Sequence, residues 1–197
     1  MKKIIEKLVK FLNSKIETMD QSDLIVEIPG YLAFVTHNAA KYNLPSLTDK
    51  MNQYNDPVNK SSFEEVRAIL CEVQRHLIRL VNKIIKNADA QDKTLLLGSL
   101  PGYHKVYLDP SANKFSMEFE PYQKLYDISR LDLKIEKELA TLALVDLLLD
   151  YEIAPDQLGQ CVGCGKYFFK ETRHSQIYCS QKCGHLTRSR ERYQRKD

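Results

Sequence analysis

Cys161-Val-Gly-Cys164 and, fourteen residues later, Cys179-Ser-Gln-Lys-Cys183 determine how the C-terminal part of this chain folds. These two segments contain four of the five cysteines in the 197 residues. Two close cysteine pairs, separated by enough chain to form a hairpin, have the spacing of a tetrahedral zinc site. Because four thiolates leave no open position on zinc, the pattern predicts one structural Zn²⁺ rather than a catalytic one.

Two histidines, His174 and His185, lie close enough in sequence to compete as ligands. With four cysteines available, we expect the thiolates to occupy every position. The only other cysteine is Cys71, so the sequence indicates no disulfide framework. A zinc-type cysteine spacing without disulfides is typical of a reducing compartment, which predicts a cytoplasmic protein.

The composition predicts a soluble protein with one medium domain and one small one. Hydrophobic residues make up 43% of the chain and charged residues 28%, which is sufficient for a packed core. The most apolar stretch, 139–149, contains Asp146 and is far shorter than the roughly 20 apolar residues of a membrane span. We therefore expect neither a signal peptide nor a membrane partner.

Charge is divided unevenly along the chain. Residues 161–197 contain nine Lys or Arg and three acidic residues, a net charge of +6, so the remainder of the +3 chain carries −3. A basic, metal-binding tail on a mildly acidic body indicates an anionic partner for the tail.

The first third of the chain predicts helices. Residues 3–18 place apolar side chains on one side of an amphipathic helix. Pro29-Gly30 is expected to interrupt the chain, and Tyr31–Tyr42 to form a second helix that ends before Pro45.

The clearest helix prediction begins at Ser62-Phe-Glu-Glu65, where Ser62 and Glu65 fit a capping box. Apolar residues then recur with 3,4 spacing, at Phe63, Val66, Leu70, Val73, Leu77, Leu80 and Ile84. This 63–84 seam fits either a helix buried within the chain or a coiled-coil homodimer. We favour the first, because coiled-coil pairing usually needs more than three heptads.

The remainder of the body predicts a mainly α fold with a small β-hairpin, an α+β domain. A short helix is expected at 90–98, a hairpin near 103–119 with strands at 104–108 and 115–119, and a strong helix at 129–151. Pro155 then suggests a boundary between a domain at 1–155 and a zinc module at 156–197.

The zinc module predicts a treble-clef-like order. Lys166–Phe169 and Gln176–Tyr178 are expected to pair as two strands. Ser180 is a good N-cap for a helix beginning at Gln181, which places Cys183 in its first turn. Thirty-seven residues cannot bury enough apolar surface to fold alone, so metal binding and folding should be coupled.

The run from Cys161 to Tyr193 resembles the bacterial CGNR zinc finger, which has a C-x-x-C knuckle, an aromatic strand, a Tyr/Trp-Cys-Ser segment and an Arg-rich helix. The upstream order, with Phe11-Leu12-Asn13 in an early helix and Asn43-Leu44 ending another, is similar to the ABATE domain. This resemblance implies a stress-induced transcription regulator. One difference is that Cys183-Gly-His-Leu186 replaces the family's Cys-Gly-Asn-Arg.

The C-terminal helix predicts a nucleic-acid surface. Its candidate contact residues are all basic: Lys182, Arg188, Arg190, Arg192 and Arg195. Arginine forks suit phosphates and guanine edges, so DNA is the expected partner. A surface that binds RNA or an acidic protein without site-specific DNA binding is the alternative.

An enzyme is not expected, because the sequence has no glycine-rich phosphate loop, no His-Glu-x-x-His and no nucleophile elbow. The isolated His37, His76 and His104 are taken as surface or core residues. The helical body remains able to hold a small ligand between its helices. Tyrosines that line such a pocket, or simply pack the hairpin, are Tyr103, Tyr107, Tyr122 and Tyr126.

Overall fold

The computed structural model describes residues 2–36, 60–87, 94–95, 102–109, 114–121, 133–150, 155–170 and 176–194. Its helices are α1 (Lys2–Asn13), α2 (Gln21–Val35), α4 (Lys60–Asn87), α5 (Leu133–Asp150) and α6 (Gln181–Gln194), with short 3-10 helices η1 (Ile16–Thr18) and η3 (Pro155–Gln157). Its strands are β1 (Thr94–Leu95), β2 (Gly102–Asp109), β3 (Lys114–Pro121), β4 (Leu158–Gln160) and β5 (Tyr167–Phe169). The mainly helical fold with an antiparallel hairpin agrees with the sequence prediction.

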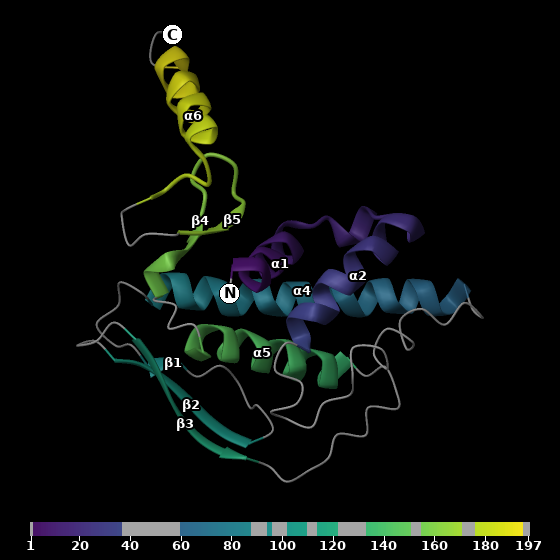
Figure 1. Cartoon of the computed structure of the whole chain (residues 1–197). Helices are drawn as coiled ribbons and strands as arrows, with labels where there is room; N and C mark the ends of the chain where they lie inside the picture. Colours follow the sequence, from purple (N-terminus) through teal and green to yellow (C-terminus); the bar gives the residue numbers. More distant parts are fainter. Residues whose placement is uncertain are drawn as a thin grey trace.

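The long helix α4 forms the centre of the body, with α1 on one side and α5 on the other, and α2 runs across from α1 to α5 (Figure 1). Its predicted seam faces these helices: Phe63 is partly buried, and the other six residues are buried, Val66, Leu70, Val73, Leu77, Leu80 and Ile84. The seam is therefore occupied by the chain's own core. This is the first of the two alternatives, and it removes the reason for a homodimer through the 63–84 helix.

The predicted interruption at Pro29-Gly30 is wrong, because both residues lie inside α2. Pro29 costs the helix one backbone hydrogen bond. The helix continues because Leu24, Ile28 and Leu32 recur every fourth residue and are buried, with exposed fractions of 2% or less. Burial of each such side chain stabilises by about 1.5–3 kcal/mol, which offsets the lost bond.

Two helix boundaries also differ from the sequence prediction. The first helix ends at Asn13 instead of continuing to residue 18, and the segment after it forms η1. Ser62 is not an N-cap, because α4 begins two residues earlier, at Lys60. Lysine and serine both have acceptable helix propensity, so the helix can extend past the predicted cap. Residues 37–42 of the predicted Tyr31–Tyr42 helix lie outside the described residues.

The sheet of the body has the order β1-β2-β3. The predicted hairpin strands are confirmed and are longer than expected, with Gly102 opposite Pro121 and Asp109 opposite Lys114. The helix predicted at 90–98 is wrong at its described residues, since Thr94–Leu95 pairs with β2 as a third strand. The Thr-Leu-Leu-Leu run favours a helix when it is considered alone. The edge of β2 supplies backbone hydrogen-bond partners for Thr94–Leu95, and these favour a strand.

The predicted 129–151 helix is confirmed over α5, but from Leu139 to Leu148 it is buried on all sides rather than on one. Every residue from Leu139 to Leu148 is buried, including Thr141 and Asp146. Three neighbours, α4, α2 and β3, contact α5 and together enclose it. The buried Glu136 accepts a hydrogen bond from the Tyr31 hydroxyl at 3.1 Å, which ties α5 to α2.

The β4–β5 hairpin follows Pro155 and packs directly on the helical body. Leu158 and Tyr167 belong to the same hydrophobic core as the helices, and Phe169 packs against that core. Beyond this hairpin, α6 extends away from the body (Figure 1).

Candidate metal centre

The first cysteine pair lies in the turn between β4 and β5. The Cys161 N–H donates to the Lys166 carbonyl at 2.8 Å, and the Gly165 N–H donates to the Cys161 carbonyl at 2.8 Å. Gly165 has φ +73°, a left-handed conformation that glycine adopts without strain. The knuckle is therefore closed by its own backbone, with Cys161 buried and Cys164 exposed.

The strand pairing in this module differs from the prediction. β5 pairs with β4, with Gln160 opposite Tyr167, rather than with 176–178. Residues 176–177 have no regular structure, but the Val162 N–H donates to the Ile177 carbonyl at 3.1 Å. The pairing was missed because Leu158–Gln160 contains a glycine and has little strand propensity. The treble-clef order remains a prediction.

The second cysteine pair lies at the start of α6. Ser180 is the N-cap, as predicted: its Oγ accepts from the Cys183 N–H at 3.1 Å, and its carbonyl accepts from the Gly184 N–H at 3.1 Å. Cys183 thus lies in the first helical turn, and Cys179 immediately precedes the cap. The cap fixes the spacing between the two thiols.

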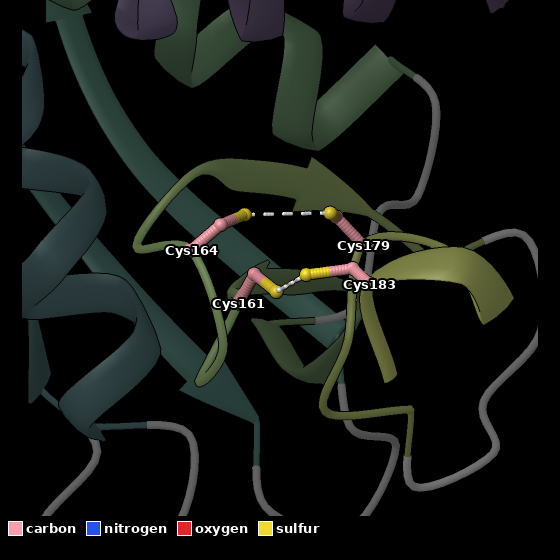
Figure 2. Close-up of side chains that lie close together, drawn as sticks. All are labelled: Cys161, Cys164, Cys179 and Cys183. Carbon is pink, nitrogen blue, oxygen red and sulfur yellow. Dashed lines mark hydrogen bonds between the residues drawn. The ribbon is translucent and has the colours of Figure 1, made fainter. Parts of the chain in front are cut away.

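The four predicted ligand sulfurs converge on one point (Figure 2). All four Sγ atoms lie within 4.8 Å of one another, with Cys161 and Cys183 3.4 Å apart and Cys164 and Cys179 3.6 Å apart. A zinc–sulfur bond of about 2.3 Å in a tetrahedron requires a sulfur–sulfur separation of about 3.8 Å. The four cysteines are therefore positioned to coordinate one metal ion, and their dimensions fit zinc.

Burial, backbone N–H groups and hydrogen bonds between the thiols shift their pKa values in different directions. Burial raises the pKa of Cys161, but backbone N–H groups of Cys179, Cys164 and Gly163 act on its sulfur and lower the pKa to about 6. The hydrogen bond from Cys183 to that sulfur raises the pKa of Cys183 to about 12. Burial raises the pKa of Cys179 as well. Of these three thiols, Cys161 is therefore the one that ionises most readily.

No histidine of the described residues enters the group. Within the described residues, the candidate metal ligands around this point are the four cysteines alone. His185 lies exposed on α6, and His174 lies outside the described residues.

The predicted nucleic-acid residues lie on a helix that faces solvent. Lys182, Arg188, Arg190 and Arg192 are all exposed on α6, and Arg195 lies outside the described residues. The Arg188 Nε donates to the Gly184 carbonyl at 3.1 Å. The ion pairs among the described side chains all lie on the helical body, and none of them involves α6.

Exposed apolar side chains accompany this basic helix, and sequence reasoning missed three of them, Val162, Ile177 and Leu186. Of the six large hydrophobic residues exposed in the described part of the chain, four belong to the metal module: Val162, Ile177, Leu186 and Tyr193. Val162 at 69% and Tyr193 at 74% are the most exposed of the four. The available signal was the position of Val162 between two metal ligands, where a side chain has no core to enter.

His76 is a packing residue. Its Nε2 lies 2.7 Å from Thr141 Oγ1, which itself donates to the Lys137 carbonyl at 2.7 Å. Because the only hydroxyl proton is committed to Lys137, His76 must be the donor to Thr141. Burial lowers its pKa, and the cations Arg79, Lys137 and Lys83 lower it further.

The remaining isolated residues add no site among the described side chains. His37, Tyr122 and Tyr126 lie outside the described residues, and His104, Tyr103 and Tyr107 are described only as backbone positions of β2.

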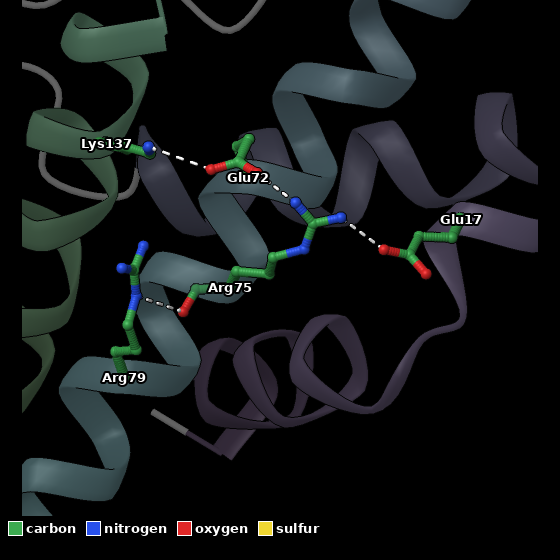
Figure 3. A network of polar contacts seen from close by, with 5 residues as sticks. All are labelled: Glu17, Glu72, Arg75, Arg79 and Lys137. Carbon is green, nitrogen blue, oxygen red and sulfur yellow. Dashed lines mark hydrogen bonds and ion pairs between the residues drawn. The ribbon is translucent and has the colours of Figure 1, made fainter.

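A polar network on the body joins three elements of the fold (Figure 3). Arg75 on α4 binds Glu17 of η1 at 2.5 Å and also pairs with Glu72. Glu72 in turn pairs with Lys137 of α5 at 3.3 Å. The network connects η1, α4 and α5 on the surface of the helical body.

No described helix combines the length and the apolar character needed to cross a bilayer. Comparisons with family models, with curated proteins and with solved structures find no match to this chain.

Proposed function

We propose that the chain is a zinc-stabilised DNA-binding protein that acts as a transcription regulator rather than as an enzyme. The observation that carries the proposal is α6. It begins at a metal ligand, projects from the body (Figure 1) and exposes four basic side chains that have no acidic partner among the described residues. Unpaired arginines on a projecting helix attract phosphates.

The metal has a structural role in this proposal. Four thiolates occupy all positions of a tetrahedral Zn²⁺, so the ion fixes the knuckle against the start of α6 instead of activating water. Gly163 lies against Thr187 and Cys183, which places α6 directly on the knuckle. The similarity of Cys161–Tyr193 to the CGNR zinc finger supports the same role, and a structural zinc–thiolate site is consistent with the reducing cytoplasm.

The proposed nucleic-acid interface uses two sides of α6. At 100° per residue, Arg188 and Arg192 share one side of the helix, and Lys182, Leu186 and Tyr193 share another. The first side suits the phosphate backbone. The second presents an aromatic ring and an aliphatic side chain that can contact bases or sugars.

A second function has its own support in the exposed apolar residues. Val162 and Ile177, joined by a backbone hydrogen bond, are 69% and 52% exposed beside the basic helix. Apolar contacts flanked by arginine also suit single-stranded RNA or an acidic protein. Site-specific DNA binding predicts enrichment of particular DNA sequences, whereas this interaction role predicts none.

The test is selection of genomic DNA fragments by the zinc-loaded protein at near-physiological salt, read by sequencing. The proposal expects a few enriched sites that disappear in the Arg188→Gln/Arg192→Gln variant. On an enriched site, loss of two phosphate contacts should reduce the slope of log K against log salt by about 1.8.

A matched control removes two exposed cations from the body, Arg79→Gln/Lys83→Gln. This variant should select the same sites as the unmodified protein. Steep salt dependence without enrichment, together with tighter binding to RNA, would instead support the interaction role. No binding to either nucleic acid would refute the proposal.

A further inference from the structure

The backbone of Tyr167 in β5 has no partner within its own hairpin. In an antiparallel pair, directly opposed residues alternate between hydrogen-bonded and non-hydrogen-bonded. Cys161 bonds to Lys166, and Gln157 bonds to Lys170, so these pairs are the bonded ones. By alternation, the Gln160–Tyr167 pair between them is not bonded, and the Tyr167 N–H and carbonyl face the outer edge of β5.

Asn13, the last residue of α1, satisfies both groups. The Asn13 Nδ2 donates to the Tyr167 carbonyl at 2.8 Å, and the Tyr167 N–H donates to Asn13 Oδ1 at 2.8 Å. A side-chain amide offers a donor and an acceptor side by side, as a neighbouring strand would. Asn13 thus acts as a one-residue strand at the edge of β5, 154 residues away in sequence.

Hydrogen bonds from α4 fix both Asn13 and Tyr167 on the helical body. Gln74 of α4 donates from Nε2 to the carbonyls of Phe11 at 2.6 Å and Ser14 at 2.8 Å, which fixes the end of α1 around Asn13. The Tyr167 hydroxyl donates to Asn82 Oδ1 of α4 at 3.0 Å. Tyr167 is therefore bound to α1 through its backbone and to α4 through its side chain.

We propose that Asn13 is a positioning residue for the metal centre. Tyr167 lies opposite Gln160, and the chain between these two residues contains Cys161 and Cys164. The hydrogen bonds to Asn13 therefore fix the two strand ends that carry Cys161 and Cys164 before the ion binds. Less conformational entropy is then lost when the thiolates coordinate the metal. By linkage, Zn²⁺ stabilises the helical body through the same contact. This role is independent of whether α6 binds nucleic acid.

The test measures Zn²⁺ affinity of the full chain by chelator competition, together with the thermal midpoint of the helical signal with and without Zn²⁺. Asn13→Ala should weaken Zn²⁺ binding about tenfold, at the lower end of the effect of outer-shell residues. The upward shift of the thermal midpoint by Zn²⁺ should also decrease. A second variant, Asn13→Asp, keeps the acceptor for the Tyr167 N–H but places an oxygen against its carbonyl, and should weaken affinity as well.

Two matched controls separate positioning from general destabilisation. Ser14→Ala removes an exposed hydrogen bond at the same helix end. Val145→Ala disturbs a buried residue of α5, across α4 from β5 (Figure 1). Both should bind Zn²⁺ as the unmodified chain does. Unchanged affinity in both Asn13 variants, or an equal loss in Val145→Ala, would overturn the proposal, as would a thermal midpoint that Zn²⁺ does not move.

Discussion

Gly163→Ala should weaken the metal centre through a steric clash. A Cβ at Gly163 would lie 2.1 Å from Thr187 Oγ1, 3.2 Å from Cys183 Sγ and 3.3 Å from Thr187 Cβ. The hydroxyl cannot rotate away without cost, because it donates to the Cys183 carbonyl at 2.9 Å. The added methyl group therefore separates the knuckle from α6, and Cys183 moves with the helix.

The size of this effect follows from packing. Overfilling a tight contact costs about 1–3 kcal/mol, and each 1.4 kcal/mol is about a tenfold change in affinity. We therefore expect Gly163→Ala to weaken Zn²⁺ binding by roughly five- to 150-fold. The assay is competition with a chromophoric chelator at fixed pH, since thiol coordination releases protons.

Thr187→Ala provides the decisive control. This change removes the atom at 2.1 Å and leaves only contacts that a few tenths of an ångström relieve. Alone it should weaken affinity less than Gly163→Ala does, because it deletes one half-exposed hydrogen bond worth about 0.5–1.5 kcal/mol. Combined with Gly163→Ala, it should restore most of the lost affinity. Equal loss with and without the threonine, or no loss at all, would refute the packing of α6 on the knuckle.

Three further outcomes are expected. Cys164→Ser or Cys179→Ser should release Zn²⁺ and unfold α6 while the core helices stay folded. Hydrogen exchange should show this as lost protection of the α6 amides. Stoichiometric zinc in either variant would contradict the four-cysteine centre. Gly30→Ala should stabilise the protein by about 0.5–1 kcal/mol in urea unfolding, because its Cβ would meet no atom within 4 Å inside α2; a lower urea midpoint would contradict this. Burial lowers the folded-state pKa of His76 below 6.5, so the unfolded state binds more protons near that pH. The contribution of His76 to the free energy of unfolding should therefore be complete above about pH 6.5 and fall below it. A His76→Gln variant should show a weaker fall in the free energy of unfolding between about pH 7.5 and 5.

Much of the site could be read from sequence because its signals are local. The C-x-x-C spacing, the Ser180 cap and the basic residues of α6 each depend on neighbours a few positions apart. The same holds for the strands at 104–108 and 115–119, whose hairpin needs only a short connection. Short-range patterns fix short-range geometry, and the structure agrees with them.

The errors concern segments whose partners the local pattern does not specify. A proline-containing segment stayed helical because distant core residues buried it, and Thr94–Leu95 became a strand because β2 offered an edge. β5 paired backward with β4 rather than forward with 176–178. In each case a partner outside the segment, which the local pattern does not specify, supplied more free energy than the local preference.

By itself, the sequence determined which residues can coordinate a metal and which carry the positive charge, since ligand chemistry and charge belong to the residues themselves. Only the tertiary structure decided that the amide of Asn13 completes the edge of β5. It also decided that the 63–84 seam lies inside the chain. The physical reason is that buried hydrogen bonds and apolar surface must be satisfied wherever a partner exists, and the folded chain alone defines which partner is near.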